Sequence, residues 1–322
     1  MGYNRENYAR IKAEYDGKYL RAAEQAQLRR AEVHARVPGI AEIDAELSKS
    51  GIRVFEASLS GDRAMIDIIN AENRVLLKKR ADMLVAAGYK SNYTEIKYEC
   101  AECGDTGVVD YRMCKCMKEK LIMAGLESSG MAELIAVQSF DNFDLNFYNG
   151  DARVRIEAIL SIVKPYAENF EPGKSVSIIM MGNTGLGKTH LSSAIGAKVI
   201  EKGHDVYYTA SVDMLNDFET EKFSNFGRGS EKGLTDKYFS CDLLIIDDLG
   251  TEVVNQFTAT CLYSLVSSRL IKRKATIINT NYTRDELRKK YTDRITSRIF
   301  GEYTVLPFLG SDIREQKLKM KR

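Results

Sequence analysis

Long apolar runs are absent from this 322-residue sequence, and their absence limits where the protein works. A helix that crosses a membrane needs about 20 consecutive apolar residues, and no such run occurs. The first residues, from Met1 to Glu6, lack the apolar core of a secretory signal, and Glu6 stands where an N-myristoylation site has Ser or Thr. We therefore expect a cytoplasmic protein without a membrane partner.

An excess of charge is also lacking, because 47 Lys and Arg balance 45 Asp and Glu to a net charge of +2. A net charge near zero neither requires nor excludes a nucleic-acid partner, since local clusters of basic residues matter more for such binding than the net charge does. Three basic clusters are present, each either a DNA contact or a solvated face: Arg269 to Lys274, Arg288 to Lys290, and Lys317, Lys319, Lys321 and Arg322. No internal repeat is evident, and the length suits one large domain with a smaller unit.

Histidine is scarce, and none of the three histidines lies close in sequence to the four clustered cysteines, Cys100, Cys103, Cys114 and Cys116. Two close pairs with this separation suit a tetrahedral Cys₄ zinc site, although the second pair has an unusually tight C-x-C spacing. Redox cysteines and the absence of any site are the alternatives, and disulfides are disfavoured in a cytosolic protein. We predict a structural Zn²⁺ site with a small hairpin at Val108–Tyr111, and we expect Cys241 and Cys261 to be small core residues.

One motif matches a known pattern in full. The run Gly182, Asn183, Thr184, Gly185, Leu186, Gly187, Lys188 and Thr189, followed by His190, fits the phosphate-binding loop G-x-x-x-x-G-K-[ST]. An apolar strand at 175–181 enters the loop, and a helical pattern at 191–200 leaves it. Backbone N–H groups then face the phosphates at a helix N-terminus, Lys188 reaches the terminal phosphate oxygens and Thr189 offers its hydroxyl to Mg²⁺. The sequence therefore predicts binding of a nucleoside triphosphate.

Strands alternate with helices from about residue 140 onward. Expected strands lie at 176–181, 205–209, 243–247, 275–280 and 303–307. This βαβ pattern predicts an α/β fold with a parallel sheet between helices, in which the strand at 275–280 lies between those at 176–181 and 243–247. The glycine-rich segment Asn225–Ser230 is expected to be a mobile loop.

Acidic and polar side chains end the expected strands. Asp247 and Asp248 follow an apolar strand. We expect Asp247 to hold the Mg²⁺ ion or its waters, and Asp248 to orient or deprotonate the attacking water. Asn281 follows the next strand and is expected to reach the γ-phosphate and that water, with Asn279 as the rival and a turn-forming role as the alternative.

Three arginines near the C-terminal end are candidates for contacts with phosphate. Arg294 and Arg298 share one helix face, which either is solvated or projects a guanidinium into the ATP site of a neighbouring subunit. Arg314 lies on a short terminal segment and is either a surface charge or a third cation for the site.

The N-terminal part, residues 5–90, predicts three helices. Tyr8, Ile11 and Tyr15 begin one apolar stripe, Pro38-Gly39 ends the first helix, and Ser50-Gly51 is expected to end the second. A third helix is expected from Asp62 to Ala87. Periodicity alone fits a small helical bundle and a partner-docking module equally well.

Together these motifs resemble the AAA+ ATPases, in particular the DnaC/DnaI-type replicative helicase loaders and the related IstB-type transposase helpers. The resemblance covers residues 140–322 and implies that Gly182 to Thr189 is Walker A, that Asp247 and Asp248 are Walker B, and that Asn281 is sensor 1. It further implies that Arg298 is the arginine finger, Arg314 is sensor 2, and the segment Phe140–Asp144 borders the adenine pocket. Asp248 departs from the Glu that many members carry. The cysteine spacing is similar to the zinc segment of loader-like proteins.

The resemblance implies an ATPase that uses ATP and Mg²⁺, carries Zn²⁺, self-associates through its ATP site and loads a DnaB-type helicase onto single-stranded DNA during replication initiation. An IstB-type transposase-associated ATPase and a nucleotide-binding regulatory module with little turnover are the alternatives. The expected division is a helical partner-binding region at 1–95, a zinc knuckle at 96–120, a linker at 121–150 and an AAA+ ATPase domain at 151–322.

Overall fold

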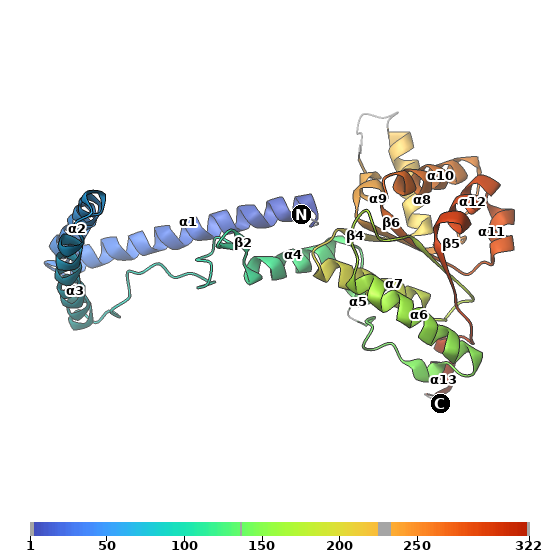
Figure 1. The fold of residues 1–322 in the computed structure, drawn as a ribbon, viewed down its shortest axis with the longest axis horizontal. Helices are drawn as coiled ribbons and strands as arrows, with labels where there is room; N and C mark the ends of the chain where they lie inside the picture. The colour runs from blue at the N-terminus through green and yellow to red at the C-terminus, as the bar shows by residue number, and fades with distance from the viewer. Residues whose placement is uncertain (1–2, 136, 225–232, 321–322) are drawn as a thin grey trace. The chain divides into compact units, whose positions relative to one another are not determined.

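The computed structural model describes residues 3–135, 137–224 and 233–320, so the predicted loop Asn225–Ser230 lies outside the described residues. The chain forms two compact units, one made of residues 1–11 with 118–322 and the other of residues 12–117. Figure 1 shows the elements of both.

The larger unit contains a five-stranded parallel sheet in the order β4-β5-β6-β3-β7. Its strands lie close to the predicted ranges, at Ile178–Met181 (β3), Val206–Ala210 (β4), Leu243–Leu249 (β5), Ala275–Thr280 (β6) and Thr304–Pro307 (β7). As predicted, β6 lies between β5 and β3. The carboxyl ends of β3, β5 and β6 therefore come together at one edge of the sheet.

Side-chain alternation along the strands places a hydrophobic core on each face of the sheet. In β3, Ile178 and Met180 belong to one core and Ile179 and Met181 to the other, which is the period of two that a strand imposes. The first face packs against α6 (Asp151–Glu168) and α7 (Lys188–Glu201). The second packs against α8 (Ser211–Ser224), α10 (Gln256–Ile271), α11 (Arg284–Lys290) and α12 (Asp293–Glu302). The α/β class with helices on both faces is thus confirmed (Figure 1).

Shorter elements connect and cover this unit. They are α4 (Lys115–Ser128), α5 (Ala132–Ile135), a 3₁₀ turn at Leu145–Phe147, α9 (Asp236–Ser240) and α13 (Ile313–Met320). Among the described residues, no helix combines the length and the apolar character that a membrane span requires.

The N-terminal helices are α1 (Arg5–Arg36), α2 (Ile40–Ser60) and α3 (Arg63–Ala86). α2 and α3 pack against each other, and the last turns of α1 join them through a cluster of Val33, Val37, Ile40 and Leu84. The predicted end of α1 at Pro38-Gly39 is confirmed, and the Asp62 side chain caps α3 by accepting a 3.0 Å hydrogen bond from the Met65 N–H.

The prediction that Ser50-Gly51 ends the second helix was wrong, because α2 continues to Ser60. Glycine inside a helix costs only about 1 kcal/mol relative to alanine. Buried side chains at Ile43, Ser50 and Ala57 recur at intervals of about two turns and keep α2 packed through this point. The positive φ of 72° at Gly61 instead marks the end of the helix.

Candidate functional site

The phosphate-binding loop connects β3 to α7 in the predicted strand–turn–helix arrangement. All three of its glycines have positive φ, 147° at Gly182, 72° at Gly185 and 84° at Gly187. A Cβ on Gly185 would lie 1.9 Å from Asp312 Oδ1, and one on Gly187 would lie 2.8 Å from the Tyr148 hydroxyl. The positive φ and these close contacts together favour glycine at both positions.

Lys188 is held inside the loop by three hydrogen bonds from its ammonium group. Nζ donates to the backbone carbonyls of Gly182 and Asn183 and to Asn281 Oδ1, each at 2.7 Å. The residue is only 6% exposed. Burial lowers its pKa to about 8. All three of these acceptors are oxygen atoms. A phosphate group that enters the cavity would compete with them for the Lys188 ammonium group.

The carboxylate of Asp247 accepts hydrogen bonds on both oxygens. Thr189 Oγ1 and the Tyr208 hydroxyl donate to Oδ2, the former at 2.9 Å. Asn279 Nδ2 donates to Oδ1 at 2.9 Å. The predicted pair of Mg²⁺-binding side chains, Thr189 and Asp247, is therefore in direct contact. Oxygen ligands of this kind suit a hard cation such as Mg²⁺.

Asp248 has a left-handed φ of 52° and lies in the wall of the cavity. Burial and the neighbouring carboxylate of Asp247 raise its pKa. Its Oδ1 accepts a 3.3 Å hydrogen bond from Asn281 Nδ2. The rival Asn279 is fully buried beneath the site, where it contacts Asp247 and Ser192, whereas Asn281 lies at the cavity between Lys188 and Asp248.

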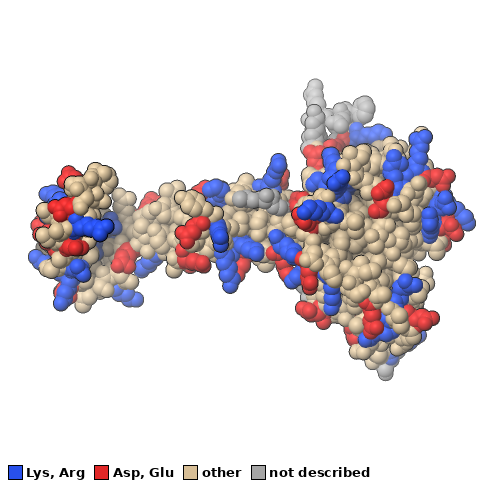
Figure 2. All heavy atoms as spheres, viewed as in Figure 1, with Lys and Arg blue, Asp and Glu red and all other residues tan. Residues whose placement is uncertain are grey.

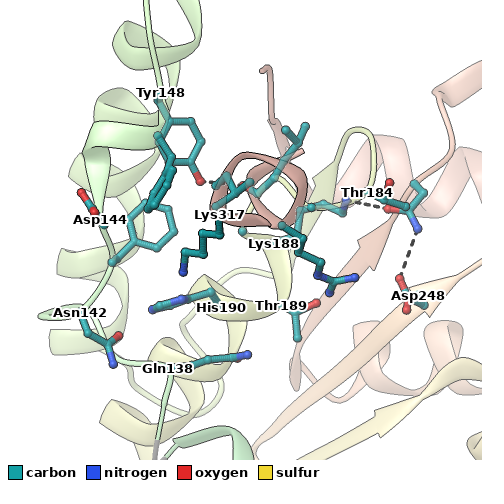
Figure 3. Close-up of a pocket in the computed structure, with 18 residues that line it drawn as sticks. Gln138, Asn142, Asp144, Tyr148, Thr184, Lys188, Thr189, His190, Asp248 and Lys317 are labelled. Atoms are coloured by element: carbon teal, nitrogen blue, oxygen red, sulfur yellow. Dashed lines mark hydrogen bonds between the residues drawn. The ribbon is translucent and has the colours of Figure 1, made fainter. Parts of the chain in front are cut away.

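The same cavity extends to a wall with aromatic side chains that precedes the first strand of the sheet (Figure 3). Phe143 stacks on Tyr148, and its ring meets His190 edge-on at 5.1 Å. His190 Nε2 hydrogen-bonds the Ser139 carbonyl at 2.8 Å, and burial lowers the pKa of the imidazole. Asn142 and Asp144 of the predicted segment line this end, while Phe140 packs against the core. The flat aromatic face of a nucleobase suits such a wall.

α13 contributes two cations to the lining of the cavity. Arg314 and Lys317 both line it, and Lys317 Nζ lies 5.2 Å from the Phe147 ring centroid. Arg298 does not line this cavity; on α12, its guanidinium lies over the Tyr263 ring at 4.6 Å. Arg294, one turn earlier on α12, is exposed. Of the predicted arginines, Arg314 therefore lines the cavity, whereas Arg298 of the same chain does not.

The cysteine pairs converge in the smaller unit. The Sγ atoms of Cys100, Cys103, Cys114 and Cys116 all lie within 4.8 Å of one another. Cys100 to Cys114 is 3.8 Å and Cys103 to Cys116 is 3.6 Å, close to the edge of about 3.8 Å that follows from four sulfurs 2.3 Å from a tetrahedral Zn²⁺. The chemistry and spacing of these donors fit a metal ion.

Local structure explains how the tight C-x-C pair takes part. Cys114 follows β2 (Arg112–Met113) and Cys116 lies in the first turn of α4, so a strand-to-helix turn separates the two sulfurs. The predicted hairpin is present, with β2 paired to β1 (Val108–Val109). Cys241 and Cys261 are buried in the larger unit, as predicted.

One basic cluster contains a buried arginine. Arg269 is 1% exposed and donates to the backbone carbonyls of Tyr238, Cys241 and Ala275, so both alternatives for this residue, a DNA contact and a solvated face, were wrong. Lys274 likewise donates to the Cys241 carbonyl. In the other two clusters, Arg288 and Lys289 are exposed, and Lys321 and Arg322 lie outside the described residues. Figure 2 shows basic and acidic side chains interspersed on the visible face.

Sequence reasoning missed several residues of the cavity and of its support. Gln138 and Tyr148 line the cavity, and Tyr208 contacts Asp247 from β4. Lys317, which the sequence placed in a basic cluster, also lines the cavity. A tyrosine in an apolar strand gives no local signal of such a contact, because the partner is 39 residues away.

Comparison with known proteins places this site in context. Residues 124–316 match the family model described as IstB-like ATP binding protein. Replicative helicase loader DnaC of Buchnera aphidicola subsp. Acyrthosiphon pisum is 28% identical over 185 residues, which cover 58% of this chain and 71% of that protein. Replicative helicase loader DnaC of Escherichia coli K12 is 28% identical over 171 residues, which cover 53% of this chain and 66% of that protein.

Among solved structures, the chain is similar to a DnaC helicase loader, with 22% identity, a TM-score of 0.44 and coverage of 52% of this chain and 97% of the other. A DnaI structure has 21% identity, a TM-score of 0.46 and coverage of 55% and 94%.

Proposed function

The chain belongs to the IstB-like ATP-binding protein family, and from this premise we propose that it is an ATPase that loads a replicative DnaB-type helicase onto single-stranded DNA. One observation carries the enzymatic part of the proposal. Asn281 lies between Lys188 and Asp248 at a single cavity and is hydrogen-bonded to both. Thr189 and Asp247 are hydrogen-bonded to each other beside them.

Each residue of the site has a distinct role in the proposed reaction. The loop from Gly182 to Thr189 and the Lys188 ammonium bind the phosphates, with His190 and the aromatic wall beside the base. Thr189 and Asp247 hold the Mg²⁺ ion, which neutralises phosphate charge when bound. Asp248 orients or deprotonates the attacking water, and Asn281, which already contacts both Asp248 and Lys188, positions that water against the γ-phosphate.

The reaction is completed by a second subunit in this proposal. Arg314 supplies a cation from within the chain, whereas Arg298 lies away from the cavity of its own subunit, on a helix that also exposes Arg294. An arginine placed in trans stabilises the charge of the transition state. We therefore propose self-association through the ATP site, with Arg298 as the finger.

The proposed helicase-binding part is the helical region at 1–95. Its helix α2 exposes Ile52, Phe55 and Leu59 at intervals of three and four residues, which places them on one helix face. Exposed apolar side chains gathered in this way are typical of a protein-interaction surface. Residues 96–120 then form a zinc knuckle with a structural role, 121–150 a linker and 151–322 the ATPase domain.

The relatives named as replicative helicase loaders support DnaB-type helicase as the partner. The family description, IstB-like, supports a transposase as the second candidate. Affinity purification of the tagged full chain from its host in the presence of ATP separates the two. Recovery of the replicative helicase, and its loss in a Phe55→Asp variant, is the expected result. Recovery of a transposase in its place would contradict the loader function.

A further inference from the structure

We propose that Tyr208 is a positioning residue for Asp247, and that its hydroxyl fixes the carboxylate in the orientation that receives Mg²⁺ with the nucleotide. The proposal rests on the proposed binding of ATP with Mg²⁺ and adds a residue that lies outside the phosphate-loop and strand-end motifs. Tyr208 is in β4, next to the strand that carries Asp247.

The hydrogen bonds around Asp247 show why one more donor matters. Oδ1 accepts from Asn279 Nδ2 at 2.9 Å and from the Asp248 backbone N–H at 3.1 Å. Oδ2 accepts from Thr189 Oγ1 at 2.9 Å and from the Tyr208 hydroxyl. Each oxygen therefore has two donors, which come from β4, β5, β6 and α7. Among the described residues, Thr189 would be the one remaining donor to Oδ2 without Tyr208, and Thr189 is itself a proposed metal ligand.

Tyr208 is anchored at its backbone as well as at its hydroxyl. Its N–H donates to the carbonyl of the fully buried Ser129 at 2.8 Å. Its carbonyl faces Gly130 so closely that a Cβ there would lie 2.9 Å from the oxygen. The ring therefore projects from a fixed point.

Mg²⁺ makes a strict geometric demand on its ligands, because it requires nearly ideal octahedral coordination. Side chains that hydrogen-bond a metal ligand orient it, and their loss typically lowers metal affinity about 10–100-fold. Thr189 donates its proton to Asp247, which leaves its oxygen lone pairs for the metal. The Tyr208 hydroxyl holds Asp247, the residue that accepts this hydrogen bond from Thr189.

The test compares Tyr208→Phe with Tyr207→Phe, which makes the same chemical change at the adjacent residue. Tyr207 packs against the core on the opposite face of the sheet, with Lys237 Nζ 5.0 Å from its ring centroid. Binding of a fluorescent ATP analogue is measured in EDTA and then over a Mg²⁺ titration. For Tyr208→Phe, we expect affinity in EDTA within about twofold of wild type and a half-saturating Mg²⁺ concentration about tenfold higher. Tyr207→Phe should match wild type in both.

An unchanged Mg²⁺ dependence in Tyr208→Phe would overturn the positioning role, as would an equal change in both variants. If Tyr208→Phe does not fold, Tyr208→p-aminophenylalanine, which keeps a donor at the same point of the ring, is measured against wild type. Its half-saturating Mg²⁺ concentration should stay near that of wild type, and a tenfold increase in that concentration would overturn the proposal. Failure of the wild-type chain to bind the analogue at all would instead refute the proposed ATP site.

Discussion

Lys188 Nζ donates a 2.7 Å hydrogen bond to Asn281 Oδ1, which joins the phosphate-binding loop to the tip of β6. The same asparagine donates to Asp248, so a single side chain contacts both the cation proposed to bind phosphate and the acid proposed to activate water. Entry of a phosphate between Lys188 and its oxygen partners would therefore change the contacts of Asn281, the proposed sensor of the γ-phosphate.

ATP affinity should fall at alkaline pH. Burial lowers the pKa of Lys188 to about 8, so the free protein loses the ammonium charge as the pH rises through that value. Bound phosphate favours the charged form, so binding takes up a proton above this pH. Calorimetric titrations between pH 7 and pH 9, in two buffers of different ionisation enthalpy, should show weaker binding and rising proton uptake with pH. Equal affinity and no uptake at pH 9 would contradict the role of Lys188.

Asp248→Asn should abolish hydrolysis while preserving ATP binding. Asn tolerates the left-handed backbone at this position, so the substitution removes the negative charge without adding strain. Loss of a general base lowers turnover about 100-fold or more. Steady-state hydrolysis and nucleotide binding are measured beside Asp285→Asn, which changes an exposed carboxylate of α11 and should leave both unchanged. Equally negligible turnover in the wild type and in Asp248→Asn would favour the regulatory module, whereas substantial turnover that the substitution leaves unchanged would contradict the role of Asp248.

Arg298→Ala should lower turnover about 1,000-fold, because an arginine finger contributes at least that much. ATP binding should persist, since Arg298 does not line the cavity of its own chain. Arg294→Ala is the matched control and should retain turnover. A mixture of Arg298→Ala with Lys188→Ala, which should bind ATP weakly, should regain activity because each chain supplies what the other lacks. Absence of any recovery would argue against completion of the site in trans.

Native mass spectrometry should find one Zn²⁺ per chain. Cys103→Ser removes one of four sulfurs that lie within 4.8 Å of one another, so this variant should lose the metal and unfold at a lower temperature. Cys261→Ser, which changes a buried cysteine of the larger unit, should keep the metal. Both should bind ATP. A wild-type chain without metal would contradict the Cys₄ assignment.

Much of the ATPase fold is predictable because its signals are local. The β-strands are apolar runs bounded by turn residues, and the phosphate-binding loop is defined by eight consecutive residues, from Gly182 to Thr189. The placement of Asn281 at the cavity follows from strand order, because the carboxyl ends of adjacent parallel strands meet at one edge of the sheet.

The errors came from long-range packing. Arg269 is part of a basic run in the sequence, yet the carbonyls of Tyr238 and Cys241 bind it from 31 and 28 residues away. The pair Ser50-Gly51 is typical of a helix end, but the packing of α2 against α3 outweighs the low helix propensity of Gly51. Tyr208 reads as an ordinary strand residue, and only the folded sheet brings its hydroxyl to Asp247.

The most direct test of the loader function is a helicase-loading assay. The full chain is mixed with the replicative helicase of its host, a circular single strand carrying a short annealed oligonucleotide, and ATP. Displacement of the oligonucleotide should require the wild-type chain and should fail with Lys188→Ala in its place. Equal displacement with and without the wild-type chain would contradict the proposed function.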